Sequence, residues 1–133
     1  MALHLLLARA LRRHRLKRFF NSLSESTRNE FDHFICSVKK EETRLRRLDQ
    51  TIELLATAME AELDPPPLMK VAFARNAQAH QGWKLMPQSL RRQYLIDIFR
   101  SRFPETRLLH LENAVHEAAQ YADTHTGKPR TWT

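Results

Sequence analysis

Two stretches of the chain decide the fold: EETRLRRLDQTIELLA at residues 41–56 and PETRLLHLENAVHEAA at residues 104–119, which lie 63 positions apart. At this offset, residues 23–56 align with residues 86–119 without a gap, and nine of the 34 aligned pairs are identical. Chance at ordinary residue frequencies gives roughly two identities. Self-similarity at a fixed period is typical of repeated structural units, so the sequence predicts a duplication.

Each of the two aligned segments predicts three helices. In the last helix of each, apolar residues recur at alternating steps of three and four, which places them on one helix face. The two faces consist of Leu45, Leu48, Ile52, Leu55 and Met59, and of Leu108, Leu111, Val115, Ala118 and Ala122. Because their spacing matches, we expect the two final helices to pack against each other and share a core.

Helix boundaries can be placed from capping residues and prolines. First helices are predicted over about 3–20 and 67–81, and Ser24 and Pro87 mark the starts of the middle helices. Acids at Glu41-Glu42 and Glu105, with Pro104 before the latter, are placed in the first turns of the last helices. The run Asp64-Pro65-Pro66-Pro67 cannot continue a helix. The sequence therefore predicts an all-α protein of about six helices, built as two tandem three-helix repeats packed into one bundle: residues 1–64, residues 65–123 and a mobile tail at 124–133.

Composition excludes several functional classes. The chain has two glycines, too few for the glycine-rich loops that hold nucleotide phosphates. No apolar run approaches the ~20 residues of a membrane-spanning helix. The single cysteine, Cys36, has no partner in the chain, so we expect a small core residue and a cytoplasmic location.

The formal charge of +7 is distributed unevenly. Residues 1–23 hold six bases and no acid, residues 24–64 six bases and ten acids, and residues 65–133 ten bases and five acids. An acid-free, arginine-rich start has four interpretations: the solvated face of an ordinary helix, a mitochondrial presequence, a membrane-surface helix, or a binding site for an anionic partner.

The aligned residues resemble the small helical domain of the YdeI/OmpD-associated, or bacteriocin-protection, family. In the first segment the pattern is carried by Phe20, Leu23, Ser26, Arg28, Phe31, Ile35, Glu42, Thr43, Arg44 and Leu48. In the second it is carried by Trp83, Met86, Ser89, Arg91, Tyr94, Ile98, Glu105, Thr106, Arg107 and Leu111. The resemblance implies a mostly bacterial, all-helical module without an assigned catalytic residue. We expect this protein to depart from the family's common arrangement, with two such segments and no companion domain.

The duplicated arginines are the main candidate site residues. They lie near predicted helix starts, where guanidinium groups and free backbone N–H groups bind phosphate or carboxylate. The structural alternative is that Glu42 and Glu105 pair with arginines of neighbouring helices, while Thr43 and Thr106 satisfy first-turn donors. Together with the first helix, the candidate anion-binding or partner-binding residues are Arg12, Arg13, Arg15, Arg28, Arg44, Arg91 and Arg107.

No motif in the sequence indicates catalysis or a metal site. No two of the seven histidines are four residues apart, and no cysteine pair accompanies them. We therefore expect a non-enzymatic protein without metal or cofactor. The family resemblance implies that it acts in stress or bacteriocin protection through a protein partner.

The alternative function is nucleic-acid binding through the bases of the chain. Its phosphate-facing surface would consist of Arg12, Arg13, Arg15, Lys17, Arg18, Arg44, Arg46, Arg47, Arg91, Arg92, Arg100 and Arg102. Acids interleave with the later bases, as in KKEETRLRRLDQ at residues 39–50, which is more typical of a solvated helix face.

Overall fold

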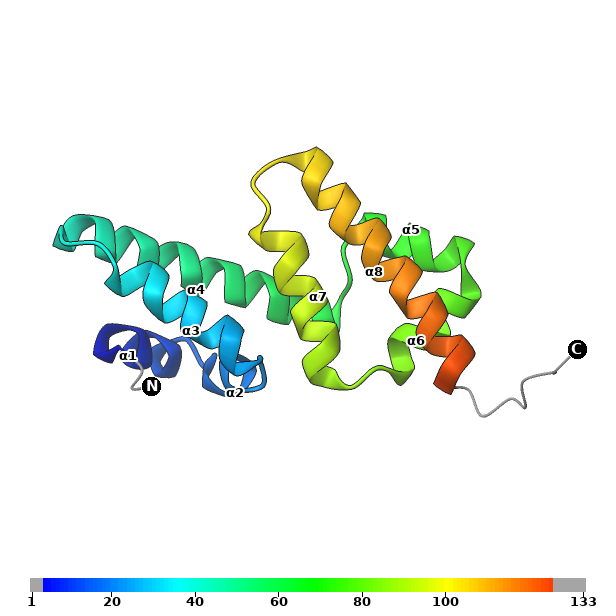
Figure 1. Ribbon diagram of the computed structural model, residues 1–133, viewed down its shortest axis with the longest axis horizontal. Helices are drawn as coiled ribbons and strands as arrows, with labels where there is room; N and C mark the ends of the chain where they lie inside the picture. The colour runs from blue at the N-terminus through cyan, green and yellow to red at the C-terminus, as the bar shows by residue number, and fades with distance from the viewer. Residues whose placement is uncertain (1–3, 126–133) are drawn as a thin grey trace, which may run out of the picture.

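The structure, a computed structural model, describes residues 4–125 and is helical throughout, with no strand in that range. Within this range, eight helices follow one another along an elongated molecule (Figure 1). They are α1 (Leu5–Arg13), α2 (Lys17–Asn21), α3 (Glu25–Cys36), α4 (Glu41–Leu63), α5 (Pro67–Arg75), α6 (Ala77–Leu85), α7 (Gln88–Arg100) and α8 (Pro104–His125). The all-α prediction is confirmed. We call residues 4–64 the first half and residues 65–125 the second half.

The prediction of six helices was wrong because each predicted first helix is broken in two. The first break follows α1, where Arg15 adopts a left-handed conformation with φ of 58°. The N–H of Leu16 donates to the carbonyl of Leu11 at 2.8 Å, and the N–H of Arg15 donates to that of Arg12 at 3.2 Å. These two bonds form a Schellman motif, and Leu11 and Leu16 are both buried as its hydrophobic pair. Glycine is the usual residue at this position, so the arginine gave no sequence signal that the helix ends here.

The second break lies between α5 and α6 and has a different cause. Asn76 caps α6, because its Oδ1 accepts the N–H of Ala79 at 3.0 Å. Other predicted starts are confirmed: Ser24 Oγ accepts the N–H of Thr27 at 3.2 Å, Pro87 precedes α7, and Pro104 is the first residue of α8. The predicted mobile tail at 124–133 begins inside α8, which runs to His125, and its remainder lies outside the described residues.

The predicted pairing of the two long helices was also wrong. In the structure α7 lies between α4 and α8 and contacts both (Figure 1). The apolar face of α8 is covered mainly by α6 and α7, whereas α4 packs on α1, α2, α3 and α7. Leu48 and Leu111 are buried as expected, but Leu45 and Leu108 are 44% and 46% exposed because no long helix covers them. Buried side chains of both halves still form one continuous cluster.

Helices α6 and α8 make the most extensive contact between any two helices. Their facing residues are small: Ala79 and Gly82 on α6 and Ala114, Ala118 and Ala122 on α8 are all buried. A Cβ atom at Gly82 would lie 1.7 Å from the carbonyl oxygen of Ala118. The absence of a side chain at Gly82 therefore sets how closely the two backbones approach.

Replacing Arg15 with glycine is expected to stabilise the protein by about 1 kcal/mol, because glycine adopts a positive φ without the steric penalty of a Cβ atom. Chemical denaturation monitored by circular dichroism measures this change. Arg12→Gly removes the same charge from inside α1 and should instead destabilise by about 1 kcal/mol. Equal effects of the two variants would show that Arg15 is not strained.

Gly82→Ala is expected to destabilise the protein by about 3 kcal/mol, because the added methyl group overlaps the backbone of α8. Thermal and chemical denaturation would measure the loss. The control Lys84→Ala, at an exposed position of α6, should change the free energy of unfolding by less than about 0.5 kcal/mol. A Gly82→Ala protein as stable as the parent would contradict the close packing of α6 on α8.

Candidate functional site

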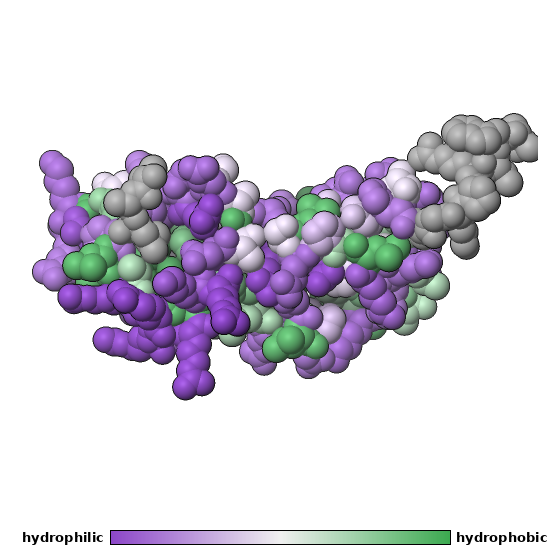
Figure 2. Space-filling model, turned by 90° about the horizontal axis from the view of Figure 1, so that it is seen from below, coloured by the Kyte–Doolittle hydropathy of each residue, from purple (hydrophilic) through white to green (hydrophobic). Residues whose placement is uncertain are grey.

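A group of exposed bases covers α1, the turn after it and the start of α2. We call this group the basic surface; it consists of Arg9, Arg12, Arg13, Arg15, Lys17 and Arg18. On α1 the bases follow i, i+3, i+4 spacing, so they share the face opposite the buried Leu7 and Leu11. Figure 2 shows strongly hydrophilic side chains projecting from the end of the molecule that carries α1 and α2. None of the six side chains forms an ion pair or hydrogen bond within residues 4–125.

The helix that carries the basic surface is anchored at its start by Asp32 of α3. The Oδ1 atom of Asp32, which is 8% exposed, accepts the backbone N–H of His4 at 2.7 Å. The Sγ atom of Cys36 lies 3.7 Å from the same oxygen. Burial and the neighbouring Asp32 carboxylate raise the pKa of the Cys36 thiol, so it stays protonated at neutral pH. Cys36 is half-buried rather than part of the core, which differs from the prediction.

Arg44 and Arg107 make equivalent contacts in the two halves. Arg44 donates from Nη2 to the carbonyl of Val38 at 2.9 Å, and Arg107 donates from Nε to the carbonyl of Ser101 at 2.7 Å. Each acceptor lies six residues before its arginine, in the loop that leads into the long helix. The predicted pairing of Glu42 and Glu105 with arginines does not occur, because neither forms an ion pair within residues 4–125. Loop carbonyls take the place of those carboxylates.

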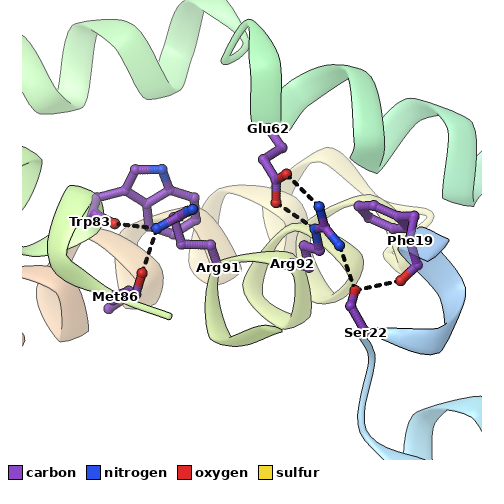
Figure 3. A network of polar contacts seen from close by, with 7 residues as sticks. All are labelled: Phe19, Ser22, Glu62, Trp83, Met86, Arg91 and Arg92. Carbon is purple, nitrogen blue, oxygen red and sulfur yellow. Dashed lines mark hydrogen bonds and ion pairs between the residues drawn. The ribbon is translucent and has the colours of Figure 1, made fainter. Parts of the chain in front are cut away.

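Arg91 and Arg28 also lie at loops between helices. Arg91 donates from Nη1 to the carbonyl of Met86 and lies 3.5 Å from that of Trp83 (Figure 3). Arg28 is half-buried, and its Nε atom has no hydrogen-bond partner in the described chain. Arg44, Arg91 and Arg107 thus stay apart from one another in contacts of their own loops, and Arg28 joins none of these contacts. Arg12, Arg13 and Arg15 lie together on the basic surface.

The contact between the two halves centres on Arg92 of α7 (Figure 3). Arg92 donates from Nε and Nη2 to the two carboxylate oxygens of Glu62 on α4, at 2.7 and 2.9 Å. Its Nη1 atom donates to Ser22 Oγ at 2.7 Å, and its guanidinium carbon lies 4.9 Å from the ring centroid of Phe19. The side chains of Arg92 and Glu62 are only 13% and 11% exposed, so this bidentate pair is largely removed from water.

Further contacts join α7 to α3. Thr27 Oγ1 donates to Gln93 Oε1 at 2.8 Å, and Arg100 Nη1 donates to Glu30 Oε2 at 2.8 Å. Arg47 of α4 donates to the carbonyl of Phe34 at 2.9 Å. Internal contacts therefore engage five of the twelve bases of the predicted nucleic-acid surface: Arg44, Arg47, Arg91, Arg92 and Arg100.

The described residues also bear on metal binding, membrane insertion and the ionisation of Tyr94. Among residues 4–125, no three histidine, cysteine or acidic side chains gather in a way that could hold a metal ion. In that range no helix combines the length and the apolar character needed to cross a membrane. Burial, with the carboxylates of Glu117 and Asp97, raises the pKa of Tyr94, so its hydroxyl stays neutral at physiological pH.

A comparison with known families gives a match in the first half. Residues 3–58 match the family described as bacteriocin-protection, YdeI or OmpD-associated. The matched segment covers α1, α2, α3 and most of α4, so it includes the basic surface and the Arg44 contact. The predicted resemblance to the YdeI or OmpD-associated family is confirmed over these residues. No curated protein and no solved structure matches the chain.

Sequence reasoning missed the role of Arg92, although a signal for it was present. In the alignment of the two halves, Arg92 stands opposite Asn29, and Ile96 stands opposite His33. Ile96 is fully buried whereas His33 is exposed, so the second segment buries a helix face that the first leaves in water. The positions at which the aligned segments differ, and not those at which they are identical, therefore indicate the contact between the halves.

Arg92→Ala is expected to destabilise the protein by about 3 kcal/mol, because it leaves the Glu62 carboxylate buried without its partner. Arg100→Ala removes the same kind of pair, with Glu30, at side chains that are 38% and 56% exposed, and should cost less than about 1 kcal/mol. Urea denaturation of both variants provides the comparison. Equal losses would show that the buried pair does not govern the contact between the halves.

Proposed function

We propose that this protein is a non-catalytic helical interaction module of the YdeI or OmpD-associated type. In this proposal it acts in the cytoplasm in protection against bacteriocins or related stress, and the basic surface binds an acidic face of a partner protein. The observation that carries the proposal is the set of six exposed, uncommitted bases on α1 and α2, without an acid among residues 1–23. The family match supports it because the matched residues include this surface.

We also propose that the two halves are tandem copies of one unit, residues 1–64 and 65–123. Helices α3 and α7 begin 63 residues apart, as do α4 and α8. Arg44 and Arg107, also 63 residues apart, each bind the carbonyl six residues before them. Under this proposal the unit has four helices, and the family match at 3–58 corresponds to residues 66–121 of the second copy.

An acidic protein face fits the basic surface better than an extended nucleic acid does. Half or more of a nucleic-acid footprint consists of phosphate contacts spread along the backbone. Here seven of the fourteen bases at residues 24–125 are engaged in internal contacts, whereas all six bases of the basic surface are unengaged and lie together at one end of the molecule. Duplex binding through α1 is the second candidate, since the same six bases also suit phosphates.

The test is a binding titration with two labelled probes, a glutamate-rich peptide and a DNA duplex, each at about 50 and about 200 mM salt. We expect the peptide to bind at the higher salt concentration and the duplex to bind only weakly there. If instead three phosphates were neutralised on a duplex, its affinity would fall about 40-fold between the two salt concentrations. A duplex that binds more tightly than the peptide at high salt would favour the second candidate.

Charge-reversed variants locate the binding surface. The triple variant Arg9→Glu, Arg12→Glu and Arg13→Glu should abolish peptide binding. The matched control is Lys39→Glu, Arg46→Glu and Lys84→Glu, which reverses three exposed bases elsewhere and changes the net charge equally. Equal loss of binding in both variants would show that only net charge matters and that the basic surface is not the site.

A further inference from the structure

A cleft of about 420 Å³ lies where the end of α7 meets α3 and α4. Its apolar lining comes from both halves, with Phe31 and Phe34 on α3, Leu54 on α4 and Phe99 on α7. Phe34 is 38% exposed, so an aromatic ring faces solvent at the cleft. The volume falls in the range of roughly 300–1,000 Å³ that is typical of small-molecule sites.

The polar groups of the cleft are mostly cationic. Arg100 and Arg102 contribute two positive charges and Glu30 one negative charge. Arg100 donates only Nη1 to Glu30 and lies over the ring of Phe31 at 4.9 Å, while Arg102 is exposed and its side chain makes no ion pair within residues 4–125. Thr51, which also lines the cleft, is 2% exposed and already donates its hydroxyl to the carbonyl of Arg47 at 2.8 Å. The lining therefore combines aromatic and aliphatic surface with the guanidinium group of Arg102, which is free to bind an anion.

We propose that this cleft binds a small amphipathic carboxylate, with its hydrocarbon part against Phe31, Phe34 and Leu54 and its carboxylate on Arg102. The guanidinium fork suits a carboxylate because it can donate two parallel hydrogen bonds. The excess of positive charge favours an anion over a neutral compound of the same shape. This site is separate from the basic surface and does not depend on the proposed function.

A second cleft of about 420 Å³ provides an internal comparison. It lies between α5 and α8 and is lined by Leu68, Val71, Leu108 and Val115. Its charged groups, Arg75 and Glu112, are opposite in sign and balance one another. The two clefts have equal volumes but differ in charge. A ligand that binds both with the same affinity therefore recognises only their apolar surface.

The experiment measures the binding of octanoate and of 1-octanol to the whole protein by amide chemical-shift mapping. We expect octanoate to shift amides around residues 30–34, 51–54 and 99–102, and to bind about tenfold more tightly than octanol because of the charged hydrogen bonds. Equal binding of the two compounds, shifts confined to residues 68–76 and 108–116, or no measurable binding would overturn the proposal.

Variants distinguish the contribution of the Arg102 charge to binding from that of the apolar lining. Arg102→Gln should lower octanoate affinity to the level of octanol, and Phe34→Ala should weaken both compounds. Glu30→Gln should strengthen octanoate binding because it removes the competing carboxylate from Arg100. The control Phe103→Ala removes an exposed phenylalanine that lines neither cleft and should leave both affinities unchanged. An Arg102→Gln protein that binds octanoate as tightly as the parent would also refute the proposal.

Discussion

The docking of α7 against α4 is the contact on which the arrangement of the two halves depends. Arg92 and Ile96 lie four residues apart on one face of α7, so the charged contact and the fully buried side chain point toward the same neighbour. Taking a guanidinium and a carboxylate out of water costs free energy, which is offset only when the geometry is good and the remaining donors are satisfied. Here Glu62 accepts two hydrogen bonds from Arg92, and Ser22 Oγ accepts a third. The ring of Phe19 packs against the guanidinium group.

This docking explains why the long helices do not pair as their apolar faces suggest. Helix α7 carries three buried residues, Leu95, Ile96 and Ile98, which together cover more than one side of the helix. A helix that is apolar on two sides can lie between two neighbours, and α7 does so between α4 and α8. The first two turns of both long helices carry no buried residue, in keeping with the exposure of Leu45 and Leu108.

Local signals in the sequence predicted where most helices start, but they could not predict which helices pack against each other. Ser24, Pro87 and Pro104 act through the backbone within one turn, so their positions could be predicted from neighbouring residues alone. The helix end at Arg15 was missed because the Schellman motif is held there by Leu11 and Leu16, which overcome the poor fit of arginine to a positive φ.

The candidate site was predictable only in part, for a related reason. The exposed bases of the first helix follow from an acid-free, arginine-rich segment with a separate apolar face. The partners of Arg44, Arg91 and Arg107 are backbone carbonyls, which carry no residue-specific signal, so the sequence suggested carboxylates instead. Arg92 and Glu62 are 30 residues apart in the chain, and nothing in the pattern around either one indicates the other.

The contact between the halves runs in one direction, from head to tail, and such a contact could in principle continue from unit to unit into a filament. The residues at the two ends lack the groups that this contact uses. On the free face of α3, Asn29 and His33 stand where α7 has Arg92 and Ile96, and at the far end His125 and Leu85 stand where the first half has Glu62 and Ser22. Neither end carries the residues of the buried pair, so neither end offers the contact between Arg92 and Glu62 a second time.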